Sequence, residues 1–121
     1  MRNIDINNLK RGDIIWVDLK GSIGSVQKGR REAIVVQNNA GNKNCPTIII
    51  VFLTTKIKKT YIPTHVVLKK NKYECFTSNN LALAEQILTI DKSQVVKFCG
   101  KLNDKDMKRI DKALYKSILI N

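Results

Sequence analysis

The densest group of positive charges in this chain follows a run of flexible residues that can form hydrogen bonds. Lys28, Arg30 and Arg31 end a segment, residues 20–31, whose glycines and serines predict a loop. A guanidinium presents five hydrogen-bond donors in a planar fork that matches a phosphate group. It can also stabilise negative charge that builds up on a phosphorus centre in a transition state. The loop therefore offers phosphate chemistry, and a solvated basic loop without chemistry stays open as the alternative.

Four further side chains on or near predicted strands are candidates for contact with a nucleic acid. Thr54 ends an apolar strand, so its hydroxyl would be displayed at the rim of a sheet. Trp16 and Tyr61 could stack on unpaired bases, but Trp16 lies in an apolar strand, which favours core packing for it. His65 begins a strand, where a structural histidine is more common than a catalytic one.

Most other kinds of catalytic site are excluded by the residues that the chain lacks. It has one histidine, and it has no H-E-x-x-H pair, phosphate-binding glycine–lysine loop or dinucleotide-binding fingerprint. Its carboxylates are scattered, whereas a two-metal nuclease needs clustered carboxylate ligands. Cys45, Cys75 and Cys99 are odd in number and form no C-x-x-C pair, which argues against a disulfide framework or a zinc site. We therefore expect chemistry without a metal or a cofactor.

The charge balance of the chain points to a polyanionic partner. Among 121 residues, 22 are Lys or Arg and 10 are Asp or Glu, which gives a formal net charge of +12. Such an excess most often means that the partner is a nucleic acid. The longest apolar run, residues 48–53, is far shorter than the roughly 20 residues that span a bilayer, and the N-terminus lacks a secretory signal. We expect a single domain over residues 1–121 that works in the cytoplasm without a membrane partner.

Six short strands and one helix must position these groups. β-Branched and aromatic runs predict strands over residues 12–19, 33–37, 47–53, 65–68, 81–86 and 95–98. Residues 38–46 have the composition of a loop. After Asn103, a good N-cap, apolar residues recur at helical spacing and predict an amphipathic helix of about four turns. This order predicts a small, strongly bent sheet or partial barrel, with the helix covering an open face.

Several motifs resemble, in order and spacing, the MazF/PemK family of toxin endoribonucleases, and the resemblance covers residues 10–118. Residues 11–19 are similar to the family's opening strand. The pattern Gly24-Ser25-x-Gln27-x-Gly29-x-Arg31 stands where the family has its G-S-E-Q-x-G-x-R-P loop, which carries an arginine near its end. The later matches are Leu53-Thr54, Pro63-Thr64-His65-Val66, Leu83-Ala84-Glu85-Gln86-Ile87 and residues 106–114.

The resemblance implies a fold, an activity and a set of partners. The fold is an SH3-like small β-barrel of the MazF/PemK/CcdB type with a C-terminal amphipathic helix, and the protein works as a homodimer. The activity is cleavage of single-stranded RNA, such as mRNA, at short specific sequences without a metal. The RNA's own 2′-hydroxyl attacks the adjacent phosphorus, which gives a 2′,3′-cyclic phosphate and a 5′-hydroxyl. A cognate MazE-like antitoxin neutralises the toxin.

Residue by residue, the resemblance assigns the catalytic roles to Arg31 and Thr54. Arg31 would stabilise negative charge on the non-bridging oxygens, and Thr54 would hold the scissile phosphate or the 2′-oxygen in line. Amide and carboxylate groups can read the edges of splayed bases. The residues predicted to bind RNA are Ser25, Gln27, Lys28, Arg30, His65, Glu85 and Gln86.

The sequence departs from the family pattern at three positions. Val26 replaces the usual glutamate of the loop, Glu32 replaces the proline that follows the arginine, and Leu88 replaces a basic residue. Glu32 could pair with Arg30 or Arg31 and partly neutralise it. Two alternatives therefore stay open. One is a relative that binds RNA but cleaves it weakly, and the other is a gyrase-poisoning, CcdB-like toxin on the same fold.

Overall fold

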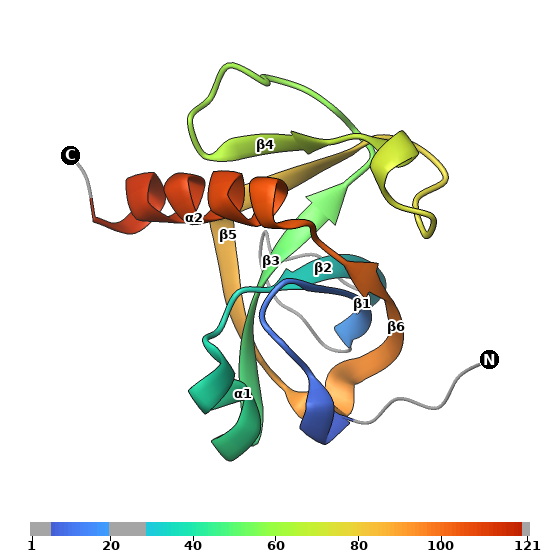
Figure 1. Ribbon diagram of the computed structural model, residues 1–121, viewed down its shortest axis with the longest axis vertical. Coiled ribbons are helices and arrows are strands. Elements are labelled where there is room, and N and C mark those ends of the chain that lie inside the picture. The colour runs from blue at the N-terminus through green and yellow to red at the C-terminus, as the bar shows by residue number, and fades with distance from the viewer. Residues whose placement is uncertain (1–5, 20–28, 120–121) are drawn as a thin grey trace.

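The computed structural model describes residues 6–19 and 29–119 of the chain (Figure 1). Among these residues, no helix is both long enough and apolar enough to cross a membrane. With η for a short 3₁₀ helix, the elements run in the order η1 (Ile6–Asn8), β1 (Asp13–Leu19), β2 (Gly29–Val35), α1 (Asn39–Asn44), β3 (Thr47–Thr54), β4 (His65–Leu68), η2 (Lys70–Lys72), β5 (Asn80–Asp91), η3 (Lys92–Gln94), β6 (Val95–Lys101) and α2 (Asp104–Ile118).

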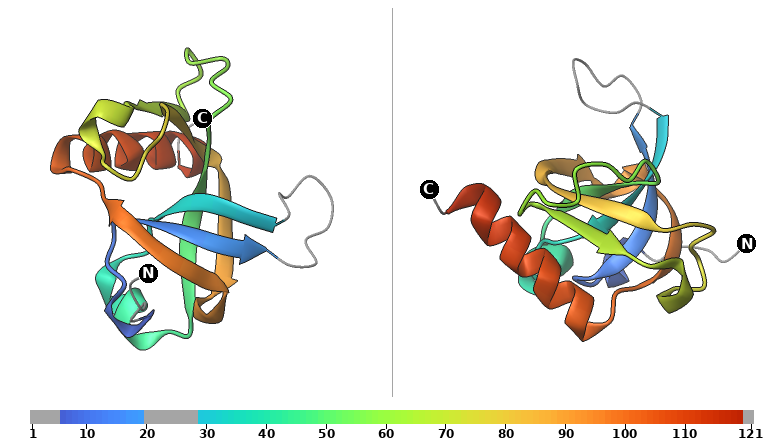
Figure 2. Two further views of the ribbon diagram at one scale, coloured as in Figure 1. Left: turned by 90° about the vertical axis from the view of Figure 1, so that its right-hand side faces the viewer. Right: turned by 90° about the horizontal axis from the view of Figure 1, so that it is seen from above.

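The strands form one antiparallel sheet of six, in the order β4-β5-β3-β2-β1-β6. The sheet is strongly bent, and α2 lies across one of its faces against β4 and β5 (Figure 2). In the described part of the chain the edge strands β4 and β6 do not pair with each other, so the sheet does not close into a complete barrel. The predicted fold class, mainly β with a C-terminal helix over a bent sheet, is confirmed.

Side chains that alternate along the strands build a hydrophobic core on each face of the sheet. On one face, Ile110 of α2 packs with strand residues that include Val51 and Leu53. On the other face, Ala33 and Phe52 belong to a second core, which β1 and β6 help to enclose. β3 therefore contributes to both cores, as its uninterrupted apolar run predicts. The same alternation assigns the side chains on the regular parts of the strands to one of these two faces.

The structure differs from the predicted elements at two loops. β2 begins at Gly29, so Arg30 and Arg31 stand on a strand and the end of the predicted loop over residues 20–31 is wrong. Pairing with β1 extends the strand to this point, with Asp18 opposite Arg30. Residues 38–46, predicted as a loop, contain α1, because the side chain of Asn38 accepts the Gly41 N–H and caps a short helix.

Asp13, at the start of β1, is a buried carboxyl whose titration should be visible in the stability of the protein. Its side chain is 4% exposed and accepts the Lys10 N–H at 2.8 Å. Burial raises the pKa of Asp13, although that hydrogen bond and two nearby lysines oppose the shift. The folded protein thus holds this proton more tightly than the unfolded chain, so the carboxyl's contribution to stability falls as the pH rises.

We expect Asp13→Asn, which keeps an acceptor oxygen for Lys10, to gain stability relative to the wild type as the pH is raised from about 4 to about 7. Urea unfolding at several pH values in this range measures the difference. Glu74→Gln, a change at an exposed carboxylate outside the helices and strands, corrects for the general effect of removing a negative charge. A wild-type protein that gained stability over Asp13→Asn at the higher pH would contradict the argument.

Candidate functional site

The site lies at the rim of the sheet where β3 ends and where β2 and β5 begin. A hollow of about 270 Å³ opens there, and both residues predicted to be catalytic, Arg31 and Thr54, line it. Because the three strand ends are neighbours in the sheet, residues from distant parts of the sequence meet at this point. The other lining residues are Trp16, Arg30, Glu32, Leu53, Thr55, Lys56 and Asn80.

The guanidinium of Arg31 is held in place by two contacts with β3. Its Nη2 donates a hydrogen bond to the Leu53 carbonyl oxygen at 2.9 Å, and its Cζ lies 5.8 Å from the centre of the Phe52 ring. Burial lowers the pKa of Arg31, but a guanidinium keeps its charge in proteins. The side chain is thus a half-buried cation in a fixed position, and partial removal from water strengthens its interaction with an anion.

Thr54 is the last residue of β3 and presents its hydroxyl on the same face of the sheet as Arg31. The alternation from Phe52 to Thr54 and from Ala33 back to Arg31 assigns both side chains to the face opposite α2. Thr54 Oγ1 accepts the Lys56 N–H at 3.1 Å, which orients the hydroxyl. Among the described residues none accepts its proton, so the hydroxyl can donate to a ligand.

His65 and Glu85 form a second polar group on this face. His65 Nε2 lies 3.1 Å from Glu85 Oε2, and Thr64 Oγ1 donates to Glu85 Oε1 at 2.9 Å. His65 Nδ1 is 3.1 Å from the Lys59 carbonyl oxygen, so the imidazole is held on both sides. His65 alternates on β4 with Val66, which packs into the core beneath α2, and therefore faces the other way.

A wide bulge in β5 exposes the residues predicted to read RNA bases. Phe52 of β3 pairs with Leu83, but the preceding Val51 pairs with Ile87. Residues 84–86, which include Glu85 and Gln86, therefore lie opposite no residue of β3. A bulge re-aims side chains away from the regular pleat and is common beside active sites. Glu85 is exposed and Gln86 is half-buried in this segment.

The remaining predicted site residues divide into two groups. Arg30 is exposed on β2 and lines the hollow beside Arg31. Ser25, Gln27 and Lys28 lie outside the described residues. The structure thus brings Arg30, Arg31 and Thr54 to one hollow, whereas His65 and Glu85 do not line it.

Glu32 does not neutralise either neighbouring arginine, and the predicted pairing is wrong. Within residues 6–19 and 29–119 its carboxylate makes no ion pair with Arg30 or Arg31, and its buried Oε2 has no hydrogen-bond partner. The strand alternation explains the result for Arg31, which points to the face of β2 opposite Glu32, whereas Arg30 shares the face of Glu32 but is exposed. Burial raises the pKa of Glu32. Replacement of the family's proline by this residue therefore leaves the Arg31 guanidinium unpaired with a carboxylate.

Three further residues line the hollow: Trp16, which the sequence makes a candidate for base stacking, together with Lys56 and Asn80. Trp16 is half-buried, stands opposite Glu32 on β2 and borders the hollow, so it is not fully enclosed in a core. A signal for it was present: Val17 and Leu19 continue the buried face of β1, which turns Trp16 to the other face. Asn80 begins β5 beside the end of β3, a contact that only the sheet order reveals.

Comparisons with known proteins agree with this fold. Residues 10–118 match the family described as PemK-like, MazF-like toxin of type II toxin-antitoxin system. Endoribonuclease MazF of Staphylococcus saprophyticus is 40% identical over 106 residues, which are 88% of this chain and 88% of that protein.

Two solved structures illustrate the likeness in three dimensions. An endoribonuclease from a mycobacterial species, solved in complex with its cognate antitoxin, is 25% identical with a TM-score of 0.76 over 93% of this chain and 97% of that one. MazF from Deinococcus radiodurans is 20% identical and shares the fold, with a TM-score of 0.75 over 89% of this chain and 94% of that one. The family match spans nearly all of the chain, so this protein belongs to the PemK-like, MazF-like toxins of type II toxin–antitoxin systems, as its motifs predict.

Proposed function

We propose that this toxin is an endoribonuclease that cuts single-stranded RNA, including mRNA, at short specific sequences without a metal. The observation that carries the proposal is the position of Arg31. Its half-buried guanidinium is fixed by the Leu53 carbonyl and the Phe52 ring beside the hydroxyl of Thr54, at a hollow open to a ligand. Preorganised donors of this kind are what stabilises charge that develops on a transferring phosphoryl group.

The proposed reaction uses the substrate's own nucleophile. The 2′-oxygen of the RNA loses its proton and bonds to the adjacent phosphorus, while the bond from phosphorus to the 5′-oxygen breaks and that oxygen gains a proton. The products are a 2′,3′-cyclic phosphate and a 5′-hydroxyl. Arg31 stabilises the extra negative charge on the non-bridging oxygens, and Thr54 donates to the phosphate and holds it in line. A role for Arg31 as general acid fits less well, because its pKa is far from neutrality.

The proposed path of the RNA follows the sheet face opposite α2. From the hollow, with Arg30 at its edge, it would pass toward the bulge of β5. There Glu85 and Gln86 can read base edges, and His65 holds the Glu85 carboxylate. Ser25, Gln27 and Lys28 lie outside the described residues, so their proposed role in RNA binding rests on the family motif alone. The net charge of +12 attracts the polyanion to the protein as a whole, and Arg30 and Arg31 provide positive charge at the hollow.

We also propose that the chain works in the cytoplasm as one domain over residues 1–121, as a homodimer controlled by a MazE-like antitoxin. The mycobacterial relative solved with its cognate antitoxin supports the last point. An acidic antitoxin segment would be attracted to the same basic surface as RNA, so that binding of one would exclude the other.

The experiment incubates the purified toxin with single-stranded RNA in excess EDTA and maps the cut sites in total RNA by primer extension. We expect cuts at one short sequence, with a cyclic phosphate on one fragment and a 5′-hydroxyl on the other. Equimolar antitoxin should abolish them. RNA binding that weakens with salt but gives no product would instead favour the catalytically weak relative. Cleavage only after addition of a divalent metal would contradict the proposed chemistry.

A further inference from the structure

Three groups that commonly bind metals meet outside the polar contacts described so far. They are the carboxylate of Glu32 and the thiols of Cys75 and Cys99, whose ligand atoms all lie within 4.8 Å of one another. The chain reaches this point three times, on β2, in the segment between η2 and β5, and on β6. Glu32 stands on β2 and Cys99 on β6, and both strands pair with β1. The positions of these two residues are therefore fixed by the sheet.

The carboxylate of Glu32 needs a partner that the described residues do not supply. Its Oε2 is buried and accepts no hydrogen bond. A buried acceptor without a partner costs about 1–3 kcal/mol, so such atoms are rare in folded proteins. The exposed side chain of Lys97 opposes the rise in the pKa of Glu32, but it forms no ion pair with Glu32 within the described ranges.

The fold leaves room for the sulfur atoms. A Cβ atom at Gly100 would lie 3.3 Å from Cys75 Sγ, a tight contact that glycine avoids. Cys75 and Cys99 are both free thiols and both half-buried, whereas Cys45 is exposed and is not in the cluster. The odd number of cysteines argues against a zinc site in the sequence. In the structure, however, Cys75 and Cys99 lie together and Cys45 is separate.

We propose that Glu32, Cys75 and Cys99 bind a thiophilic divalent cation of the zinc class, with a water molecule in the remaining position. Two thiolates and a carboxylate are ligands that zinc accepts in a tetrahedral site, and sulfur ligands disfavour magnesium and calcium. A disulfide between the two cysteines fits the site less well, since it would leave the Glu32 oxygen without a partner. On binding, the cation displaces the thiol protons.

The cation would stabilise the wall of the hollow without taking part in RNA cleavage. Glu32 lines the hollow and stands on β2 next to Arg31, but the two side chains point to opposite faces of the strand. The metal would therefore join β2 to β6 and to the segment that carries Cys75, and so hold in place the strand on which Arg31 stands. This role differs from the proposed endoribonuclease activity and does not depend on it.

The test titrates Co²⁺, a spectroscopic substitute for Zn²⁺, into metal-free protein kept reduced with a phosphine. We expect a thiolate-to-cobalt absorption band that saturates and is then abolished by Zn²⁺. Cys75→Ser and Cys99→Ser should each weaken the band strongly, and Cys45→Ser, the matched control, should leave it unchanged. Glu32→Gln keeps both sulfur ligands but removes the carboxylate. Loss of an outer-shell partner weakens metal affinity roughly 10- to 100-fold, so loss of this direct ligand should weaken cobalt affinity at least as much.

The same variants show whether a lost signal reflects a lost ligand or a lost fold. Circular dichroism of each apo variant should match that of the wild type, and Zn²⁺ should raise the melting temperature of the wild type and of Cys45→Ser but not of Cys99→Ser. The absence of a band in the wild type, or a band that persists in Cys99→Ser, would overturn the proposal. No RNA is present, so failure here leaves the proposed ribonuclease untouched.

Discussion

Replacing Arg31 by alanine is expected to slow RNA cleavage by about 10²–10³-fold, the usual effect of removing one preorganised donor from a transition state. The loss should appear in the single-turnover rate at saturating RNA, because the guanidinium acts on charge that is absent from the ground state. The geometry supports an effect of this size. The Leu53 carbonyl and the Phe52 ring fix Arg31 before substrate arrives, so little reorganisation is left for the reaction.

A second variant at this position separates geometry from charge, and a variant at a distant lysine is the control. Arg31→Lys keeps the positive charge but loses the planar fork and the hydrogen bond to Leu53, so it should recover only a small part of the rate. Lys112→Ala removes an exposed cation from α2 and should leave the rate unchanged. An Arg31→Ala protein that cleaves at the wild-type rate would remove Arg31 from the proposed mechanism.

The elements predicted best from the sequence are those whose pattern is local. β1, β3 and α2 each carry their own periodicity or an unbroken apolar run, and each forms close to where that pattern predicts it. Arg31 and Thr54 were matched to a motif, and they meet because β2 and β3 are neighbours. The resemblance of short motifs to those of the family thus singles out the two predicted catalytic residues without reference to the pairing of their strands.

Features that depend on pairing between distant strands could not be predicted in this way. The composition of residues 20–31 indicates a loop, but pairing with β1 extends β2 back to Gly29. The bulge at residues 84–86 exists only relative to β3. The proximity of Cys75 to Cys99 follows from the packing of a loop on β6, and a count of cysteines cannot reveal it. In each case a long-range contact overrode or supplemented a weak local preference.

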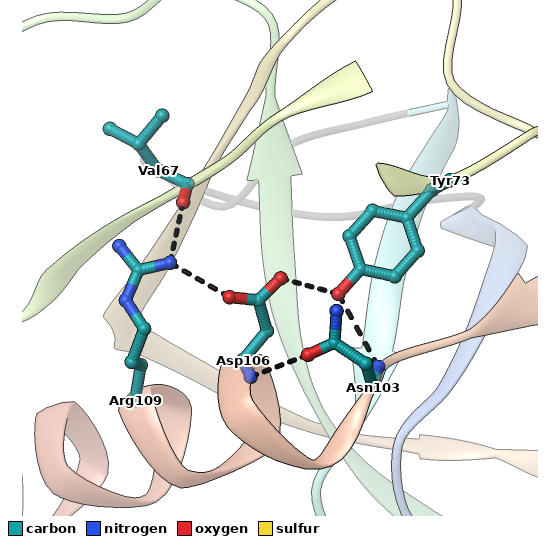
Figure 3. Close-up of polar contacts among 5 residues, drawn as sticks. All are labelled: Val67, Tyr73, Asn103, Asp106 and Arg109. Carbon is teal, nitrogen blue, oxygen red and sulfur yellow. Dashed lines mark hydrogen bonds and ion pairs between the residues drawn. The ribbon is translucent and has the colours of Figure 1, made fainter. Parts of the chain in front are cut away.

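The first turn of α2 is joined to the rest of the protein by a polar network around the buried side chains of Tyr73 and Asp106 (Figure 3). The hydroxyl of Tyr73 donates to Asp106 Oδ2, and Arg109 Nη1 donates both to Asp106 Oδ1 at 2.9 Å and to the Val67 carbonyl oxygen at 3.0 Å. The Asn103 side chain accepts the Asp106 N–H at 2.7 Å and caps the helix. Burial and the neighbouring Asp106 carboxylate raise the pKa of Tyr73, so its hydroxyl remains a donor.

Asp106→Ala is expected to destabilise the protein by about 2–4 kcal/mol. It removes the carboxylate that accepts hydrogen bonds from Tyr73 and Arg109, and it leaves the buried Tyr73 hydroxyl without this acceptor. Tyr73→Phe should cost less, about 1–2 kcal/mol, since Asp106 keeps Arg109. Urea unfolding of both variants and of the double variant gives the coupling between the two side chains. We expect a coupling of about 1–2 kcal/mol.

A matched control separates this network from the general effect of negative charge at a helix N-terminus. Asp104 stands in the same first turn of α2 but is exposed, so Asp104→Ala should lose only the interaction with the helix dipole, about 0.3–1 kcal/mol. If Asp106→Ala cost no more than Asp104→Ala, the network would contribute nothing beyond that interaction. If the Tyr73 and Asp106 effects were additive, the two side chains would act independently and their hydrogen bond would not be what docks α2. The expected coupling instead makes the Tyr73–Asp106 hydrogen bond the link through which the segment before β5 and α2 stabilise one another.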